Sequence, residues 1–165
     1  MGQAGAQADL FYQTNMEDHY LQYRDTLMHL LVNEVGGNMI QVELRCGQEN
    51  STDYWQIFWE NQDAMSRTNF ANNAYVPVND NADPYSINAS GFQFSEMDST
   101  ISQVVLPLKQ ELATSKGESL YVYLNYVDWA SSAFEHRADT AEYAEFIEAA
   151  IEHIYNTWGF YVDGI

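Results

Sequence analysis

The chain has 165 residues, a net charge of −18, and 46% hydrophobic and 15% aromatic residues. This length and composition suit one folded domain with a sizeable core and argue against disorder. Only 6 Lys and Arg residues stand against 24 Asp and Glu residues. Such a surface repels phosphate groups, so we expect neither a nucleic acid nor a membrane as partner. Cys46 is the single cysteine, which excludes an internal disulfide and a cysteine-based zinc site.

The chain begins with small and polar residues over 1–15, which we expect to be a disordered N-terminal segment. This segment lacks the basic and apolar regions of a secretory signal peptide, so the sequence leaves the localisation open. Residues 16–165 are predicted to form one domain. Its first element is an amphipathic helix over 16–35, which Gly36 ends. The helical spacing predicts an apolar stripe of Tyr20, Tyr23, Leu27, Leu30 and Leu31.

A strand over 38–45 follows, because apolar and polar residues alternate there. Residues 46–94 show little periodicity, and we expect a long functional loop with one short helix near 53–60. Its many aromatic residues argue against disorder. Within this loop Asn79, Asn81 and Asp83 have the spacing of the first ligands in a calcium-binding loop. Pro84 stands where an EF-hand needs glycine, so no metal site is predicted.

The second half of the chain repeats the order helix then strand. A helix begins at Ser95, bends near Pro107 and ends at Gly117. The next strand, 119–127, is almost continuously apolar, which indicates burial on both faces. A long helix then runs from 139 or 140 to Trp158, and a final strand is predicted over 160–165.

Helices that alternate with strands predict a mixed α/β fold with a parallel sheet. Three strands with their helices are part of either a (β/α)₈ barrel or a doubly wound sheet. Nucleotide-binding folds require a glycine-rich turn or a Walker sequence after the first strand, and neither is present here. The segments after the strands are long and those before them are short, which favours a barrel because barrel active sites lie after the strands.

Polar and aromatic residues gather where the first two strands end. Arg45 and Glu49 lie at the end of the first strand, and Asn125, Asp128 and Trp129 lie at the end of the second. Carboxylates, amides and guanidinium groups bind sugar hydroxyls, and an indole stacks on a pyranose ring. The sequence therefore predicts that these five residues bind a carbohydrate substrate. The alternative is that they only cap and solvate their loops.

Four stretches, in this order, carry a family resemblance: "GGNMIQVELRCGQEN", "VNDNADPYSINASGFQFSEMD", "LYVYLNYVDW" and "EYAEFIEAAIEHIYNTWGFYVDGI". Together they resemble the N-terminal half of a retaining glycoside hydrolase of the (β/α)₈-barrel clan that includes cellulases and xylanases. The resemblance covers about residues 16–165. It implies a partial TIM barrel, about strands 2 to 4 with their helices, and a long insertion after the first strand present. It also implies hydrolysis of O-glycosidic bonds in a β-linked glycan, no cofactor, and an extracellular location.

In this clan two glutamates perform the reaction, one as acid/base and one as nucleophile. The resemblance places both beyond Ile165, so it assigns no catalytic residue here and implies that this chain alone is inactive. Its partners would be the carbohydrate and the missing half of the barrel. Arg45 resembles an arginine that positions the nucleophile. The residues also leave open a non-catalytic glycan-binding or assembly module complete at this length, and a doubly wound α/β enzyme.

Overall fold

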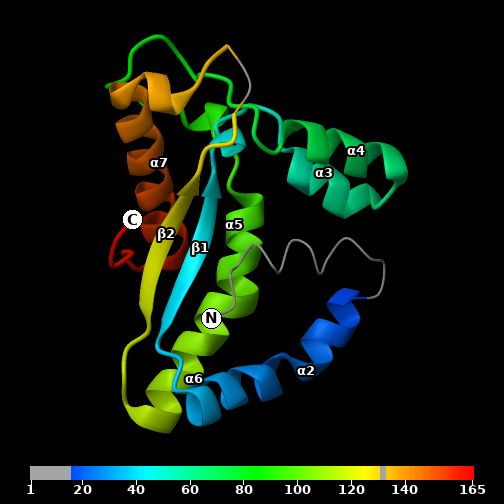
Figure 1. Ribbon diagram of the computed structural model, residues 1–165, viewed down its shortest axis with the longest axis vertical. Coiled ribbons are helices and arrows are strands. Elements are labelled where there is room, and N and C mark those ends of the chain that lie inside the picture. Colours follow the sequence, from blue (N-terminus) through cyan, green and yellow to red (C-terminus); the bar gives the residue numbers. More distant parts are fainter. Residues whose placement is uncertain (1–15, 131–132) are drawn as a thin grey trace. The chain divides into compact units, whose positions relative to one another are not determined.

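The computed structural model describes residues 16–130 and 133–165. They form a mixed α/β fold with a two-stranded parallel sheet (Figure 1). The expected disorder of residues 1–15 lies outside the described residues. None of the described helices is long and apolar enough to cross a membrane. The elements are α2 (Met16–Leu30), β1 (Met39–Arg45), α3 (Tyr54–Asn61), α4 (Ala64–Asn73), α5 (Ser95–Thr100), α6 (Leu106–Lys116), β2 (Tyr121–Val127) and α7 (Thr140–Trp158).

The chain divides into two compact units, and each strand contributes to both. The described part of the first unit comprises residues 16–43, 97–125 and 162–165, and the second comprises 44–96 and 126–161. The polar residues predicted at the strand ends therefore belong mainly to the second unit.

In the first unit, α2 ends in a wide π-helical turn, Leu31–Val35, and Gly36 closes it with a φ of 73°. The helix buries Met28 and Val32, whereas Leu27 and Leu30 of the predicted stripe are about half exposed. The predicted helix is confirmed, but the choice of its buried face is wrong. Periodicity gives the width of an apolar arc, and packing decides which edge of the arc is covered.

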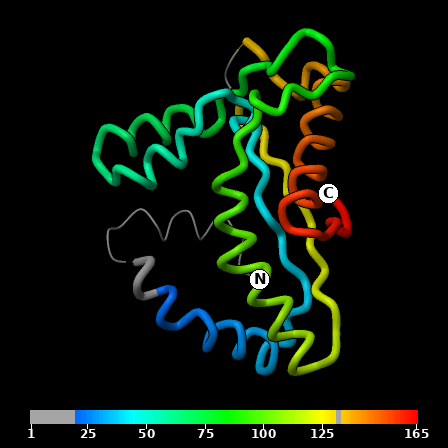
Figure 2. Tube along the Cα trace, turned by 180° about the vertical axis from the view of Figure 1, so that it is seen from behind, coloured from blue at the N-terminus to red at the C-terminus, as the bar shows by residue number. Residues whose placement is uncertain are grey.

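The helix predicted from Ser95 is confirmed, and it continues to Lys116 as α5, a π-helical turn at Ile101–Val105, and α6. Figure 2 follows this continuous helix from behind. Pro107 stands in the first turn of α6, directly after the π-helical turn. Proline has no amide hydrogen to donate inside a helix, and the π-helical turn before it is where the regular bonding pattern of this helix changes. Gly117 ends α6 with a φ of 68°.

The predicted strand over 160–165 is wrong as a strand, because only Gly164 forms a bridge, parallel to Tyr123 of β2. The amide of Asp163 donates to the carbonyl oxygen of Val122 at 2.7 Å. The Asp163 carboxylate accepts from the amide of Val122, also at 2.7 Å. The Val122 amide therefore donates to a side chain, whereas in a longer strand pairing it would donate to a backbone carbonyl. The segment still lies along the edge of β2, on the side away from β1. The amide of Tyr121 donates in the other direction, to the carbonyl oxygen of Asn38 directly before β1.

Strand β2 itself is confirmed, but the prediction that both its faces are covered is wrong. Val122 and Leu124 are buried, while Tyr121 is exposed and the rest of the strand is half-buried. The prediction counted the tyrosines of this strand as apolar residues. Because a phenol has a polar end, such a ring can lie on a partly exposed face.

In the second unit, the region predicted as one long loop, 46–94, contains the helix pair α3 and α4. The sequence predicted α3 but missed α4, whose residues are mostly polar. Asp53 and Asp63 cap these helices by accepting the amides of Gln56 and Ser66. The helices contact each other through the stacked rings of Phe58 and Phe70, 6.0 Å apart. The true loop is therefore residues 74–94.

Helix α7 is confirmed with the predicted ends. Asp139 caps its first turn by accepting the amides of Ala141 and Glu142. Gly159 ends the helix with a φ of 73°, a left-handed conformation that suits glycine. The buried face is the one around Phe146, Ala150 and Ile154.

Candidate functional site

Arg45 stands at the carboxyl end of β1 and is almost fully buried, with 7% of its surface exposed. Its guanidinium group forms an ion pair with Glu96 in the first turn of α5. It also lies above the rings of Phe70 and Tyr75, 5.1 and 5.7 Å from their centroids. Cation–π contacts of this kind are each worth roughly 0.5–2 kcal/mol. The ion pair and the rings hold the arginine in one orientation.

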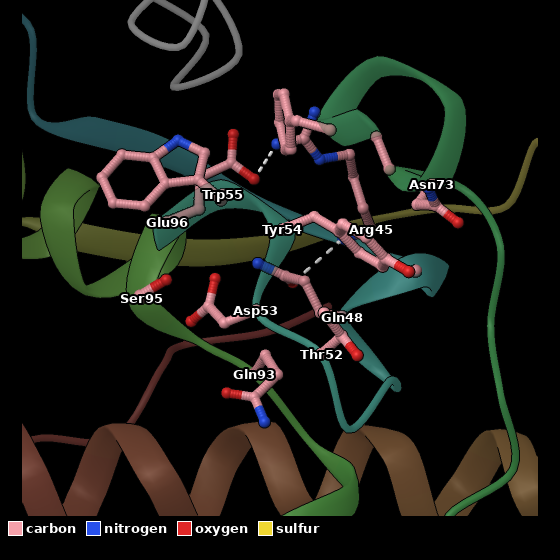
Figure 3. A pocket seen from close by; sticks show the side chains of 13 residues that line it. Arg45, Gln48, Thr52, Asp53, Tyr54, Trp55, Asn73, Gln93, Ser95 and Glu96 are labelled. Carbon is pink, nitrogen blue, oxygen red and sulfur yellow. Dashed lines mark hydrogen bonds and ion pairs between the residues drawn. The ribbon is translucent and has the colours of Figure 1, made fainter. Parts of the chain in front are cut away.

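A small pocket opens beside Arg45 (Figure 3). Its volume is about 30 Å³, which holds water or a hydroxyl group but not a sugar ring. The lining combines aromatic rings with hydrogen-bonding side chains: Gln48, Thr52, Asp53, Tyr54, Trp55, Phe70, Asn73, Gln93, Ser95 and Glu96. Figure 3 shows the ion pair with Glu96 and the bond from the Arg45 amide to Gln48. A larger ligand would lie outside and extend only a substituent into this pocket.

Trp129 is 72% exposed, which is unusual for so large an apolar side chain. Its indole packs against the Tyr75 ring, with centroids 5.0 Å apart and planes at 43°. Because Tyr75 also lies under the Arg45 guanidinium, these three side chains form one contiguous group. We call Arg45, Glu96, Phe70, Tyr75 and Trp129 the arginine–aromatic cluster.

Two further residues of the predicted site do not join this cluster. Asp128 closes a turn, since its carboxylate accepts the amides of Ala130 at 3.0 Å and Arg137 at 3.4 Å. It also bonds to the thiol of Cys46, whose pKa is raised to about 12, mainly by burial and then by this carboxylate. Asn125 is half-buried and belongs to the first unit.

Glu49, the fifth predicted residue, lies in a different buried network. One of its oxygens bonds to Nε2 of His136, and the other accepts the amide of Asp80 at 3.0 Å. Nδ1 of His136 lies 2.8 Å from the Tyr126 hydroxyl. Burial and the nearby Asp128 charge raise the pKa of Tyr126, so its hydroxyl stays protonated. A carboxylate oxygen only accepts hydrogen bonds, so Nε2 of His136 is the donor toward Glu49.

Three more carboxylates surround Glu49. Glu49, Asp80 and Glu142 each offer an oxygen, and these atoms lie within 4.8 Å of one another. Glu145, one turn further along α7, is the fourth member: it is buried, its Oε1 has no hydrogen-bond partner, and the charges of the other three act on it. Burial, followed by the charges of Asp80 and Glu142, raises the pKa of Glu145 to about 7. We call Glu49, Asp80, Glu142 and Glu145 the acidic cluster.

Sequence reasoning missed most of both clusters. One available signal was the spacing of Glu142 and Glu145, which fall on the buried side of α7 beside Phe146. The polar loop misled in another way. Asn79 and Asn81 each accept the amide two residues further on, at 2.9 and 2.7 Å, so they form local turns. Asp80, between them, is the residue that joins the acidic cluster.

No known family model, curated protein or solved structure matches this chain.

Proposed function

We propose that this chain is part of a retaining glycoside hydrolase and that the arginine–aromatic cluster contacts a β-linked glycan. The observation that carries this proposal is the exposed indole of Trp129, which is held by Tyr75 beside the buried Arg45. A pyranose ring presents C–H groups on its face and hydroxyl groups on its rim. An exposed indole matches the face, and fixed polar groups match the rim.

The pocket beside Arg45 supports the same ligand class. Gln48, Thr52, Asp53 and Gln93 offer both donors and acceptors to a hydroxyl group. The ion pair and rings around Arg45 keep the wall of the pocket in place, so a ligand loses less entropy in ordering it.

For the fold, we propose a partial (β/α)₈ barrel with about strands 2 to 4. The parallel strands β1 and β2 are joined by α5–α6, and α7 joins β2 to the segment 162–165. That segment runs parallel to β2 through its bridge at Gly164. Strands in sequential order with helical crossovers are the arrangement of a barrel.

We assign no catalytic residue in this chain. Glu49 is bonded to His136 and Asp128 closes a turn, so neither carboxylate is placed as an acid or a nucleophile for a sugar. The proposed role of this chain is substrate binding, and we expect it to bind glycans without hydrolysing them.

The test is a titration of the 165-residue chain with β-linked gluco- and xylo-oligosaccharides, followed by tryptophan fluorescence and calorimetry. We expect saturable binding, and we expect Trp129→Ala to weaken it about tenfold, which corresponds to about 1.4 kcal/mol. Tyr85→Ala is the control, because Tyr85 is 89% exposed and outside the cluster. The proposal fails if no oligosaccharide binds, if α-linked oligosaccharides bind equally well, or if Trp129→Ala binds like the unchanged chain.

A further inference from the structure

We propose that the acidic cluster of Glu49, Asp80, Glu142 and Glu145 binds a calcium ion. This inference is independent of the proposed glycan binding, since it concerns other side chains and another ligand. The sequence predicted no metal site, so the inference depends on what the fold brings together.

The cluster carries negative charge that the described residues do not balance. Glu49, Glu142 and Glu145 are 1%, 5% and 3% exposed. In the described part of the chain no Lys or Arg forms an ion pair with a member of the cluster. Of the four carboxylates, His136 bonds only to that of Glu49. Carboxylates removed from water need paired charges or a metal ion, because isolated ions are costly to bury.

Oxygen atoms of this cluster are buried without a hydrogen-bond partner. They are Oε2 of Glu142, Oε1 of Glu145 and Oδ1 of Asp80. Orphaned buried acceptors are rare in folded proteins and indicate an ion or water at the site. The other oxygen of Asp80 is held by the amide of Asn88 at 2.6 Å and the side chain of Asn81 at 2.9 Å. Those two bonds fix the carboxylate and leave Oδ1 for the cluster.

The ligand atoms and their spacing favour calcium. All are carboxylate oxygens, which hard cations prefer. The oxygens of Glu49, Asp80 and Glu142 lie within 4.8 Å of one another. Two Ca–O bonds of up to about 2.6 Å span that distance, so one calcium ion can reach all three oxygens. Calcium takes a larger coordination shell, which the neighbouring Glu145 or water would complete.

Two features outside the cluster prepare the site. His136 holds Glu49 and is itself held by Tyr126, and hydrogen-bonded supports of this kind orient metal-binding carboxylates. Gly91 lets the chain approach Asp80, since a Cβ atom on Gly91 would lie 2.2 Å from the Cβ of Asp80. Any larger residue at 91 would displace the Asp80 ligand.

The ligands come from separate segments of the second unit. Glu49 follows β1, Asp80 lies in the loop 74–94, and Glu142 and Glu145 lie in the first two turns of α7. An ion bound to all three segments links them, and it stabilises the fold because the unfolded chain does not hold these oxygens together. The proposed role of the ion is structural.

The experiment uses the 165-residue chain after treatment with a chelator. Calorimetric titration with CaCl₂ should show saturable binding, and CaCl₂ should raise the melting temperature by several degrees over the chelator sample. Glu142→Gln and Glu145→Gln should each weaken calcium binding tenfold or more. The matched control is Glu148→Gln, an exposed glutamate on the next turn of α7, which should bind like the unchanged chain.

A second measurement separates lost binding from lost folding. In chelator at pH 8, Glu145→Gln should melt at the same or a higher temperature than the unchanged chain, because it removes repulsion among carboxylates. The proposal is overturned if calcium leaves the melting temperature unchanged, if both variants keep the original affinity, or if MgCl₂ stabilises the protein as much as CaCl₂. Glycan titration of the same samples reports separately on the proposed function.

Discussion

The second unit contains two groups of buried charges that are stabilised in different ways. In the arginine–aromatic cluster, Arg45 meets Glu96 and two ring faces, so each charge has a partner inside the protein. In the acidic cluster, four carboxylates have one histidine between them, and three of their oxygens have no hydrogen-bond partner. Both clusters are buried, but the charges of the arginine–aromatic cluster neutralise each other, whereas those of the acidic cluster require a cation.

The largest expected effect comes from breaking the self-contained pair. Arg45→Met leaves Glu96, whose side chain is 14% exposed, without its counter-charge. We expect a loss of about 3 kcal/mol in the free energy of unfolding, measured by urea denaturation. The double variant Arg45→Met, Glu96→Leu should recover most of this loss, because it leaves no buried charge. Equal destabilisation of the single and double variants would contradict this interpretation of the pair.

A smaller effect is expected where the acidic cluster depends on close backbone approach. Gly91→Ala places a Cβ atom 2.8 Å from the Cα of Asp80, so the loop must shift. We expect about 2 kcal/mol of destabilisation in thermal unfolding and weaker calcium binding. Ala89→Ser, an exposed change in the same turn, is the control and should have neither effect. A Gly91→Ala protein that binds calcium normally would show that Asp80 is not a ligand.

The hydrogen bond that supports Glu49 through His136 should be worth about 1 kcal/mol. Tyr126→Phe removes the hydroxyl that bonds to Nδ1 of His136 and keeps the ring. We expect this loss in chemical denaturation. Tyr161→Phe, at a 63% exposed tyrosine, should change stability little. If the two variants behave alike, the Tyr126 hydroxyl does not support the acidic cluster.

The smallest effect concerns a buried group that stays neutral. Cys46 follows Arg45 directly and is fully buried, and its pKa is raised to about 12. The thiolate is the reactive form, and it is present only as pH approaches that value. We therefore expect the native protein to resist a thiol reagent at pH 8 and the unfolded protein to react. Fast reaction of the native protein would show that the end of β1 is open to solvent.

Sequence patterns predicted the elements that have a strong local signal. The alternation of Ile40, Val42 and Leu44 gave β1, and the glycines at 36, 117 and 159 marked three helix ends. Helix α4 was missed because its polar sequence has little amphipathic pattern, and its formation depends on the cap at Asp63 and on contact through Phe70. The segment 160–165 was predicted too strongly, because an apolar run does not show whether a side chain such as Asp163 will take the ladder bonds.

The sequence alone determined the order of helices and strands, the acidity of the chain, and the gathering of polar and aromatic residues after the strands. It placed Arg45 and Trp129 at strand ends, but only the tertiary structure placed Tyr75 between them. The sequence also could not show that Glu49 lies apart from Arg45 and Trp129. A glutamate looks the same in a sequence whether its carboxylate faces a ligand or a histidine. Apart from the Glu142–Glu145 pair, the members of the acidic cluster lie 31 to 96 positions apart in the sequence. Local patterns act over a few residues, whereas such a cluster exists only once separate segments are packed together.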